Sequence, residues 1–122
     1  MPDKLDAALI VVNYDKLPYT RLCLGSVLAA DPVFSHIIAI DNGSSDGTRE
    51  YLQEELPRLA QAAGARATVI LNDTNVGACT ARNQGLAVAQ ERYIAFMDND
   101  VCVRTRGWLR VLAEALEAAP DI

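Results

Sequence analysis

The sequence contains few of the residues from which zinc centres and disulfide frameworks are built. Its 122 residues include one histidine, one tryptophan and three cysteines, and aromatic residues make up only 6%. Cys23, Cys79 and Cys102 lie far apart and form no Cys-x-x-Cys pair, which argues against a zinc site. Their odd number favours reduced, buried thiols over disulfides. We expect His36 to be an ordinary surface residue in a loop before a strand.

Positive charge and long apolar runs are scarce as well. Lys and Arg number 11 against 16 Asp and Glu, so the formal net charge is −5. A chain this acidic has no general attraction for nucleic acid or an anionic membrane surface. No apolar run is long enough for a transmembrane helix, and residues 1–7 lack the pattern of a signal peptide. These absences predict a protein with no nucleic-acid partner that is cytoplasmic or, in its full-length form, peripheral to the inner membrane.

Short apolar segments alternate with helical ones along the chain. Strands are predicted over residues 8–12, 37–40, 68–71 and 93–97, and helices over 18–30, 48–63, 77–90 and 107–119. The strands do not alternate polar and apolar residues, so we expect both of their faces to be buried. Pro57 is expected to kink or split the second helix. The order predicts a single α/β domain, a Rossmann-like parallel sheet with helices on both faces.

Polar residues cluster directly after each predicted strand. The clusters are Asn13-Tyr14-Asp15, residues 41–47, residues 72–77 and Asp98-Asn99-Asp100. One such cluster is ordinary turn chemistry. Because ligands bind beyond the carboxyl ends of parallel strands, four clusters at one edge predict a binding site there.

The acidic residues of two clusters suggest specific chemistry. Asp98 and Asp100 are spaced to hold one hard divalent cation, Mg²⁺ or Mn²⁺, although the same residues also suit a solvated turn that ends the strand. Asp41 closes a buried strand and is placed to accept hydrogen bonds from a base or ribose. Alternatively, residues 41–47 only connect a strand to a helix that Asp46 caps.

The other candidates lie on the first strand and the third helix. Arg82 and Asn83 fall in the first helical turns after Gly77 and should face the same edge. Arg82 would pair with a phosphate or with Asp41, or else form a surface ion pair. Tyr14 would stack on a nucleobase or pack on the first helix. No Gly-x-Gly-x-x-Gly follows the first strand, which argues against dinucleotide binding.

Four segments carry a family resemblance. They are ALIVVNY (8–14), IIAIDNGSSDGT (37–48), NVGACTARNQGL (75–86) and YIAFMDND (93–100). In this order and spacing they resemble the N-terminal, nucleotide-binding half of inverting A-type glycosyltransferases, glycosyltransferase family 2, over roughly residues 8–121. The resemblance implies the GT-A fold, and the form of the second segment most resembles the rhamnosyltransferase-like branch.

The resemblance also implies residue roles. Tyr14 would stack on uracil or a related base, Asp41 would hydrogen-bond that base, and Arg82 would lie beside the base and phosphates. Asp98 would contact the ribose or support the metal, and Asp100 would ligate Mn²⁺ or Mg²⁺ bridging the diphosphate. The remaining nucleotide-binding candidates are Asn13, Asn42, Gly43 and Asn83.

The implied activity is inverting, metal-assisted transfer of a sugar from a UDP- or dTDP-sugar to an unknown glycan, lipid-linked or other acceptor, as in polysaccharide biosynthesis. In the family, the general base and acceptor pocket lie downstream of the DxD motif. Only residues 101–122 follow Asp100, so we expect a truncated domain, with the base beyond Ile122 and little or no activity in this chain alone. The unfinished sheet edge predicts a homo-oligomer.

Two alternatives are weighed against that activity. Phosphohydrolases of the haloacid-dehalogenase type also carry a DxD motif, but there it follows the first strand rather than the fourth. The other alternative is a nucleotide-sugar-binding fragment without turnover. It is supported because Glu114 and Glu117, the glutamates after Asp100, fall on a helix whose outer face should be solvated.

Overall fold

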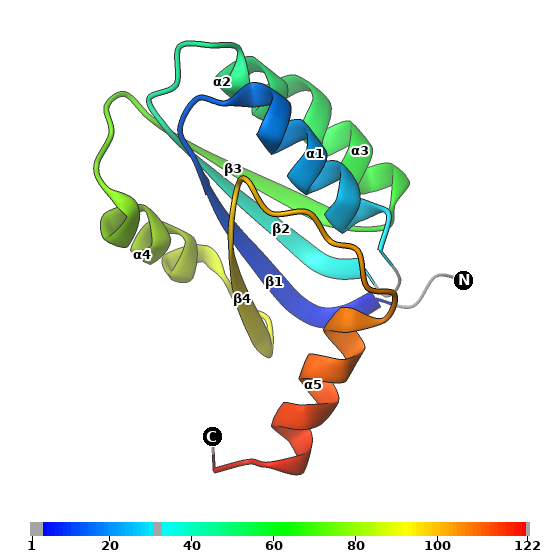
Figure 1. The fold of residues 1–122 in the computed structure, drawn as a ribbon. Coiled ribbons are helices and arrows are strands. Elements are labelled where there is room, and N and C mark those ends of the chain that lie inside the picture. The colour runs from blue at the N-terminus through cyan, green and yellow to red at the C-terminus, as the bar shows by residue number, and fades with distance from the viewer. Residues whose placement is uncertain (1–3, 31–32, 122) are drawn as a thin grey trace.

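The structure, a computed structural model, describes residues 4–30 and 33–121. Its strands are β1 (Lys4–Asn13), β2 (Val33–Asn42), β3 (Arg66–Asn72) and β4 (Tyr93–Asp98). Its helices are α1 (Leu17–Leu28), α2 (Thr48–Glu50), the π-helical turn η1 (Tyr51–Glu55), α3 (Leu56–Ala62), α4 (Ala78–Val88) and α5 (Trp108–Ala118) (Figure 1). The predicted alternation of strands and helices is confirmed. Residues 1–3, at the start of the segment 1–7, and residue 122 lie outside the described residues.

The described strands form one parallel sheet in the order β3-β2-β1-β4. Val12 pairs with Asp98, Asn13 with Asp41, and the end of β2 with the end of β3. The carboxyl ends of all four strands therefore lie along one edge. After β1 the chain builds outward through β2 and β3, then returns to the other side of β1 as β4. This reversal places a topological switch point between β1 and β4.

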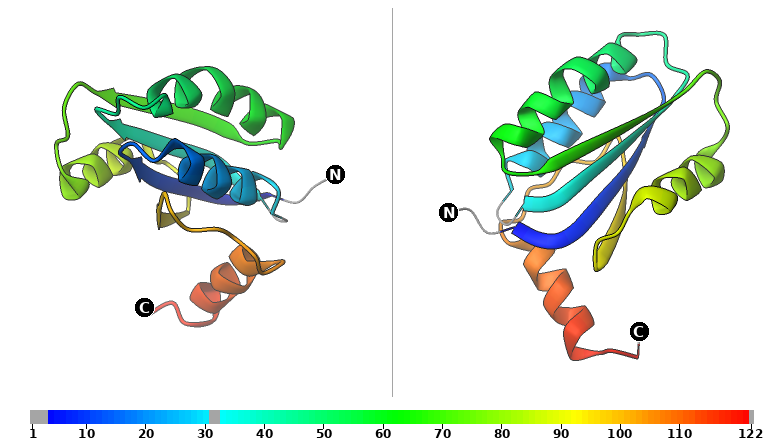
Figure 2. Two further views of the ribbon diagram at one scale, coloured as in Figure 1. Left: turned by 45° about the horizontal axis from the view of Figure 1, so that its top comes forward. Right: turned by 180° about the vertical axis from the view of Figure 1, so that it is seen from behind.

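Helices cover both faces of the sheet, as predicted (Figure 2). Leu9 and Val11 of β1 belong to the core that α1, η1, α3 and α5 complete on one face. On the other face, Ile10 of β1 packs with Ala81 of α4. A Cβ added to Gly85 of α4 would lie 2.8 Å from Cγ2 of Ile10, so α4 sits as close to the sheet as a glycine permits.

The strands differ in burial, which corrects one prediction. β1 and β2 are largely buried on both faces, as expected for interior parallel strands. In β4, however, half-buried residues alternate with exposed ones, and Phe96 is 48% exposed. The prediction of burial on both faces is wrong for β4, because it is an edge strand that α4 covers only in part. The prediction is also wrong for β3, the strand at the opposite edge, where no residue is fully buried and most are half-buried.

The helical segment after β2 is split as Pro57 predicts. The α-helical pattern gives way to η1 and resumes as α3, with Pro57 in its first turn. Proline lacks the N–H of a regular helical bond, and a π-turn is one way the backbone accommodates that loss. Gly64 follows the helix with φ of +84°, the left-handed conformation typical of a helix stop.

Predictions for two residue types need correction. His36 is not in a surface loop: β2 begins at Val33, and the buried His36 ring has Nε2 2.7 Å from Oγ1 of Thr68 and Nδ1 3.2 Å from the Glu91 carboxylate. The cysteines are free thiols as predicted, but only Cys23 is buried, and burial raises the pKa of its thiol to about 11. Cys79 and Cys102 are exposed.

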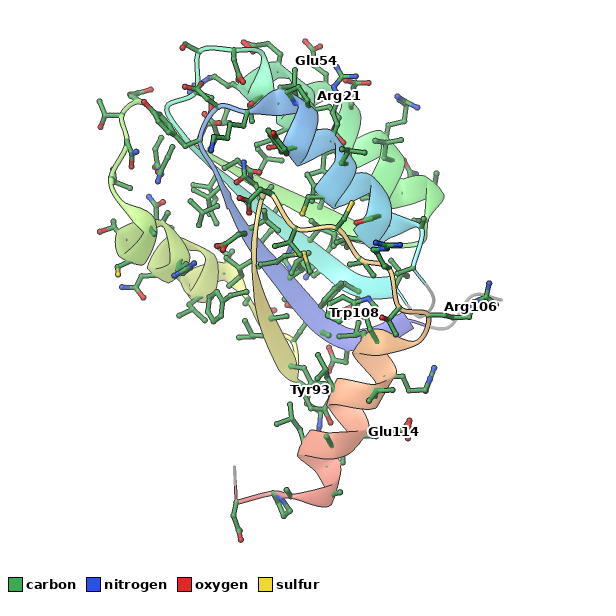
Figure 3. The ribbon with its side chains drawn as sticks, in the orientation of Figure 1. Arg21, Glu54, Tyr93, Arg106, Trp108 and Glu114 are labelled. Carbon is green, nitrogen blue, oxygen red and sulfur yellow. The ribbon has the colours of Figure 1, made fainter. Side chains whose placement is uncertain are left out.

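The last helix packs through Trp108 and Leu109 in its first turn and through the buried Ala113 in its second. Trp108 lies against the sheet, with its ring centroid 5.6 Å from that of Phe34 in an edge-to-face contact, whereas Glu114 points away (Figure 3). Glu114 is exposed, as expected for the outer face of α5. Glu117, though exposed, is turned toward the start of β4, where it accepts hydrogen bonds from Arg92 and Tyr93. Within residues 4–30 and 33–121, no helix is both long and apolar enough to cross a membrane.

Candidate functional site

The predicted polar clusters meet at the carboxyl edge of the sheet. The strands end at Asn13, Asn42, Asn72 and Asp98, and the register sets these ends side by side. The short connections that follow them lie at the same end of the molecule (Figure 1). The first and last of these residues are separated by most of the length of the chain. The parallel topology brings them together into one site.

Asp41 is the most deeply placed of the candidates. It is fully buried at the end of β2, and its Oδ2 accepts the N–H groups of Gly43 and Ser44 at 3.2 and 3.0 Å. Its Oδ1 is also buried, yet it finds no hydrogen-bond partner among the described residues. A buried oxygen left without a partner is costly to the fold, and a ligand N–H would satisfy it.

The Asp41 loop (residues 41–47) is closely packed against the loop after β3. Gly43 has φ of +83°, and an added Cβ would lie 3.1 Å from backbone atoms of Asp73 and Thr74. The neighbouring Asn42 accepts a hydrogen bond from Nδ2 of Asn72 at 3.0 Å. Asn42 and Gly43, predicted as nucleotide-binding residues, therefore hold the two loops together.

The Asp41 loop is also tied to the connection between β1 and α1. Oδ2 of Asp46 accepts the Leu17 N–H at 2.9 Å, and its Oδ1 accepts the hydroxyl of Thr48 at 2.6 Å and the N–H at 3.1 Å. Oδ1 of Asp15 accepts the Ser45 N–H at 2.8 Å. Partial burial of Asp46 acts to raise its pKa, but the bonds from Thr48 and Leu17 outweigh it and hold the pKa below the ordinary value of 3.8.

The two candidates at the end of β1, Asn13 and the residue that follows it, Tyr14, differ in availability. Tyr14 is 50% exposed beside the switch point, which leaves ring surface free for a ligand. Asn13, by contrast, is fully buried, and its amide donates to the carbonyls of Val11 and Ile40 at 3.1 and 3.2 Å. Its Oδ1 accepts the hydroxyl of Thr20. Asn13 thus supports the site from beneath.

Arg82 and Asn83 lie in the first turns of α4, with Asn83 exposed. Nη2 of Arg82 is 3.4 Å from Oδ1 of Asp98, and its guanidinium carbon lies 6.0 Å from the centre of the Phe96 ring. Arg82 therefore pairs with Asp98, not with Asp41, which corrects one of the predicted pairings. Because this ion pair is exposed, it holds the arginine weakly and leaves it free to meet a phosphate.

The 98–100 turn presents its acids to solvent. The Asp98 side chain is 70% exposed, and Asp100 is exposed as well. Carboxylate oxygens are the ligands that Mg²⁺ and Mn²⁺ prefer, so the donor set fits such an ion. In the part of the chain that the structure describes, no group of three or more His, Cys, Asp or Glu side chains could hold a metal. A cation at this turn would therefore need ligands from a bound diphosphate and water.

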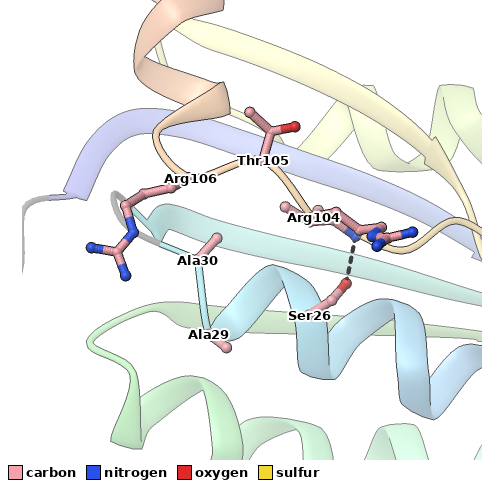
Figure 4. Close-up of a pocket in the computed structure, with 7 residues that line it drawn as sticks. Ser26, Ala29, Ala30, Arg104, Thr105 and Arg106 are labelled. Carbon is pink, nitrogen blue, oxygen red and sulfur yellow. Dashed lines mark hydrogen bonds between the residues drawn. The ribbon is translucent and has the colours of Figure 1, made fainter.

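Cavities elsewhere in the molecule are separate from this edge. One, of about 330 Å³, lies between the end of α1 and the segment before α5, where Ser26 and Arg106 line it (Figure 4). Another, of about 610 Å³, is lined by Ser35, Arg66 and Glu91 near the amino ends of the strands. Neither is lined by a carboxyl-edge candidate, so the candidate site is an open edge.

Sequence reasoning missed two supporting residues. Asp15 was noted only as part of a polar cluster, and its left-handed φ of 53° and its bond to Ser45 depend on the fold. Thr20 was not singled out, although it is a small polar residue within a largely apolar helix. That contrast was the available signal, because a buried hydroxyl needs a hydrogen-bond partner.

Comparisons with known proteins agree with this architecture. The sequence matches the family model described as Glycosyl transferase family 2 over residues 8–122. A Bacillus subtilis glycosyltransferase named for teichuronic acid biosynthesis, TuaG, is 34% identical over 93 residues, covering 76% of this chain and 35% of its own length.

Solved structures show the same fold. The Pyrobaculum calidifontis mannosyltransferase PcManGT, in complex with GDP-Man and Mn²⁺, superposes with a TM-score of 0.80 at 21% identity, covering 95% of this chain and 34% of that one. S. aureus TarS 1-349 in complex with UDP-GlcNAc gives 0.74 at 22% identity, covering 92% and 31%. The chain spans about a third of the length of these proteins. It has the GT-A fold and belongs to glycosyl transferase family 2.

Proposed function

We propose that the carboxyl edge binds the nucleotide-diphosphate sugar donor of a glycosyl transfer reaction. The observation that carries this proposal is the buried Oδ1 of Asp41 at the carboxyl end of β2, which has no hydrogen-bond partner among the described residues. The proposal is supported by the structural neighbours, since one is described with GDP-Man and Mn²⁺ and another with UDP-GlcNAc. The full proposed activity is inverting, metal-assisted transfer to an acceptor hydroxyl.

The donor we propose is a UDP- or dTDP-sugar, with its base against Asp41. Oδ2 of Asp41 is already used by two backbone N–H groups, so Oδ1 is the oxygen left for a ligand. The ring N–H of uracil or thymine can donate to such an acceptor, as can that of guanine. The half-exposed ring of Tyr14 is placed to stack on the base. Arg82 would exchange its weak pair with Asp98 for a donor phosphate.

Asp98 and Asp100 would hold the divalent cation, Mn²⁺ or Mg²⁺. Such an ion, when bound, neutralises the charge that develops on a diphosphate leaving group. We assign no catalytic base, because Glu114 and Glu117 are exposed on α5, and Glu117 is engaged with Arg92. Their position favours donor binding without turnover as the second candidate function of this chain.

Calorimetry with UDP-sugars and dTDP-sugars, with Mn²⁺ and with EDTA, tests the proposal. We expect Mn²⁺-dependent binding that Asp100→Ala weakens by about tenfold or more, whereas Glu114→Ala, an exposed acid on α5, leaves affinity unchanged. Absence of nucleotide binding, or an Asp100→Ala protein equal to the wild type, would show the proposal to be wrong. Transfer of a radiolabelled sugar to mixed acceptors would separate turnover from binding alone.

A further inference from the structure

The middle residue of the 98–100 turn points toward α1. Nδ2 of Asn99 donates to Oγ1 of Thr20 in α1 at 3.1 Å. The Thr20 hydroxyl in turn donates to Oδ1 of Asn13 at 3.3 Å, and Asn13 donates to the carbonyl of Ile40. Thr20 and Asn13 are fully buried. A continuous chain of hydrogen bonds therefore joins the turn to the ends of the two central strands.

α1 supports the rest of the segment after β4 as well. Sγ of Cys23 lies 3.6 Å from the carbonyl oxygen of Asp98, and Oγ of Ser26 accepts the Val103 N–H at 2.9 Å (Figure 4). These contacts hold backbone groups on either side of the turn. The contact between Thr20 and Asn99 differs because it fixes a side chain of the turn itself.

This contact fixes the middle residue of the turn on the face of the sheet opposite to the Asp98 side chain. Asp98 faces α4, where it meets Arg82, while Asn99 faces α1 on the other side of the sheet. Within the turn, the Val101 N–H reaches the Asp98 carbonyl only at 3.4 Å, a long hydrogen bond. Because the turn follows an edge strand and its own bond is weak, an anchor for the middle residue decides how well the two carboxylates are held.

We propose that Thr20 and Asn99 are positioning residues for the two carboxylates that would hold the cation. The inference rests on the proposed function, since it concerns the same donor site. Neither residue would touch the cation or the nucleotide. Their hydrogen bond reduces the conformational freedom that Asp98 and Asp100 would otherwise lose on binding, so it strengthens cation binding without adding a ligand.

The test compares Mn²⁺ affinity with nucleotide affinity. Mn²⁺ binding to the UDP-bound chain is followed by electron paramagnetic resonance, and UDP binding in EDTA by calorimetry. We expect Thr20→Val and Asn99→Ala each to weaken Mn²⁺ binding by about 3- to 10-fold while metal-free UDP affinity changes by less than about 2-fold. Thr20→Ser, which keeps the hydroxyl, should restore Mn²⁺ affinity. The double variant should bind Mn²⁺ no more weakly than Thr20→Val alone, because Thr20→Val already removes the bond that Asn99→Ala removes.

Further variants separate positioning from folding. Asn99→Ala leaves the buried bond between Thr20 and Asn13 intact, so it tests the turn without altering the core. Ser26→Ala, which removes a backbone contact of the same helix, is the matched control and should leave Mn²⁺ affinity near the wild-type value.

Three results would overturn the inference. The first is wild-type Mn²⁺ affinity in Asn99→Ala, and the second is equal loss of Mn²⁺ and metal-free UDP affinity in Thr20→Val and Asn99→Ala. The third is a wild-type chain that binds UDP with no dependence on Mn²⁺. That result would overturn the proposed metal site too, whereas the first two would leave the proposed function standing.

Discussion

The Asp41 loop and the 98–100 turn lie on the same edge of the sheet and are built in opposite ways. The carboxylate of Asp41 is fully buried and receives two backbone N–H groups, and its loop is tied to the loops on both sides. The Asp98 side chain is 70% exposed and meets Arg82 in a long, solvated ion pair. One acid is fixed when the protein folds, and the other remains free to rearrange.

This difference indicates a division of labour within the donor site. A preformed hydrogen-bond acceptor suits recognition of a nucleobase, because the acceptor must match the shape of the base and the pattern of its N–H groups. Exposed carboxylates suit a cation that shares its ligands with a diphosphate, since the final geometry exists only when all the partners are present. Separate substitutions in the Asp41 loop and in the 98–100 turn test this difference.

The largest effect is expected from Asp41→Ala compared with Asp98→Ala. Removal of the Asp41 carboxylate leaves the Gly43 and Ser44 N–H groups without their acceptor, so the free energy of unfolding should fall by about 2–4 kcal/mol. Asp98→Ala removes an exposed ion pair and should cost less than about 0.5 kcal/mol. Urea denaturation measures the free energy of unfolding of both variants. Equal losses of stability would contradict the difference between the two acids.

A smaller effect is expected from Gly43→Ala. The left-handed φ and the 3.1 Å approach to the backbone of Asp73 and Thr74 leave no room for a methyl group, so stability should fall by about 1–3 kcal/mol. Gly25→Ala in α1 is the matched control, because nothing lies within 4 Å of an added Cβ and helical alanine is favoured over glycine. Thermal unfolding should rank Gly25→Ala at or above the wild type; a Gly43→Ala protein as stable as the wild type would contradict the packing argument.

The smallest effect concerns pH and Asp46. Because the folded pKa of Asp46 lies below its ordinary value of 3.8, the ionised carboxylate stabilises the fold above pH 3.8, and this contribution is lost as pH falls through the folded pKa. Asp46→Asn should therefore be slightly less stable than the wild type near neutral pH. In urea titrations, the difference in free energy of unfolding between the wild type and Asp46→Asn should become smaller below pH 3.8. A difference that does not depend on pH would exclude an electrostatic origin.

The fold could be predicted from the sequence because apolar runs and helical spacing alternate without ambiguity. The ends of the strands could not be predicted, since they depend on pairing with the neighbouring strand. β2 begins at Val33, before the apolar run 37–40 that marked it in the sequence, and it therefore includes His36. The cysteines show the same limit. Cys23 and Cys102 are equally small, and only the position of α1 makes one buried and the other exposed.

The site was predictable to the extent that parallel strands share an edge. That rule brought Tyr14, Asp41 and Asp98 together from distant positions. The partner of Arg82 was not predictable, because it depends on how closely α4 approaches β1 at Gly85. The rhamnosyltransferase-like branch, the acceptor and self-association stay predictions.

The strand order also has a consequence for chain entropy. Leu9 pairs with Ile37 on one side and with Ala95 on the other, so the two pairings close loops whose lengths differ roughly threefold. The longer closure costs about 1 kcal/mol more in loop entropy. The carboxylates assigned to the cation thus follow the strand whose attachment to the sheet is entropically the most expensive, and a bound donor would help to offset that cost.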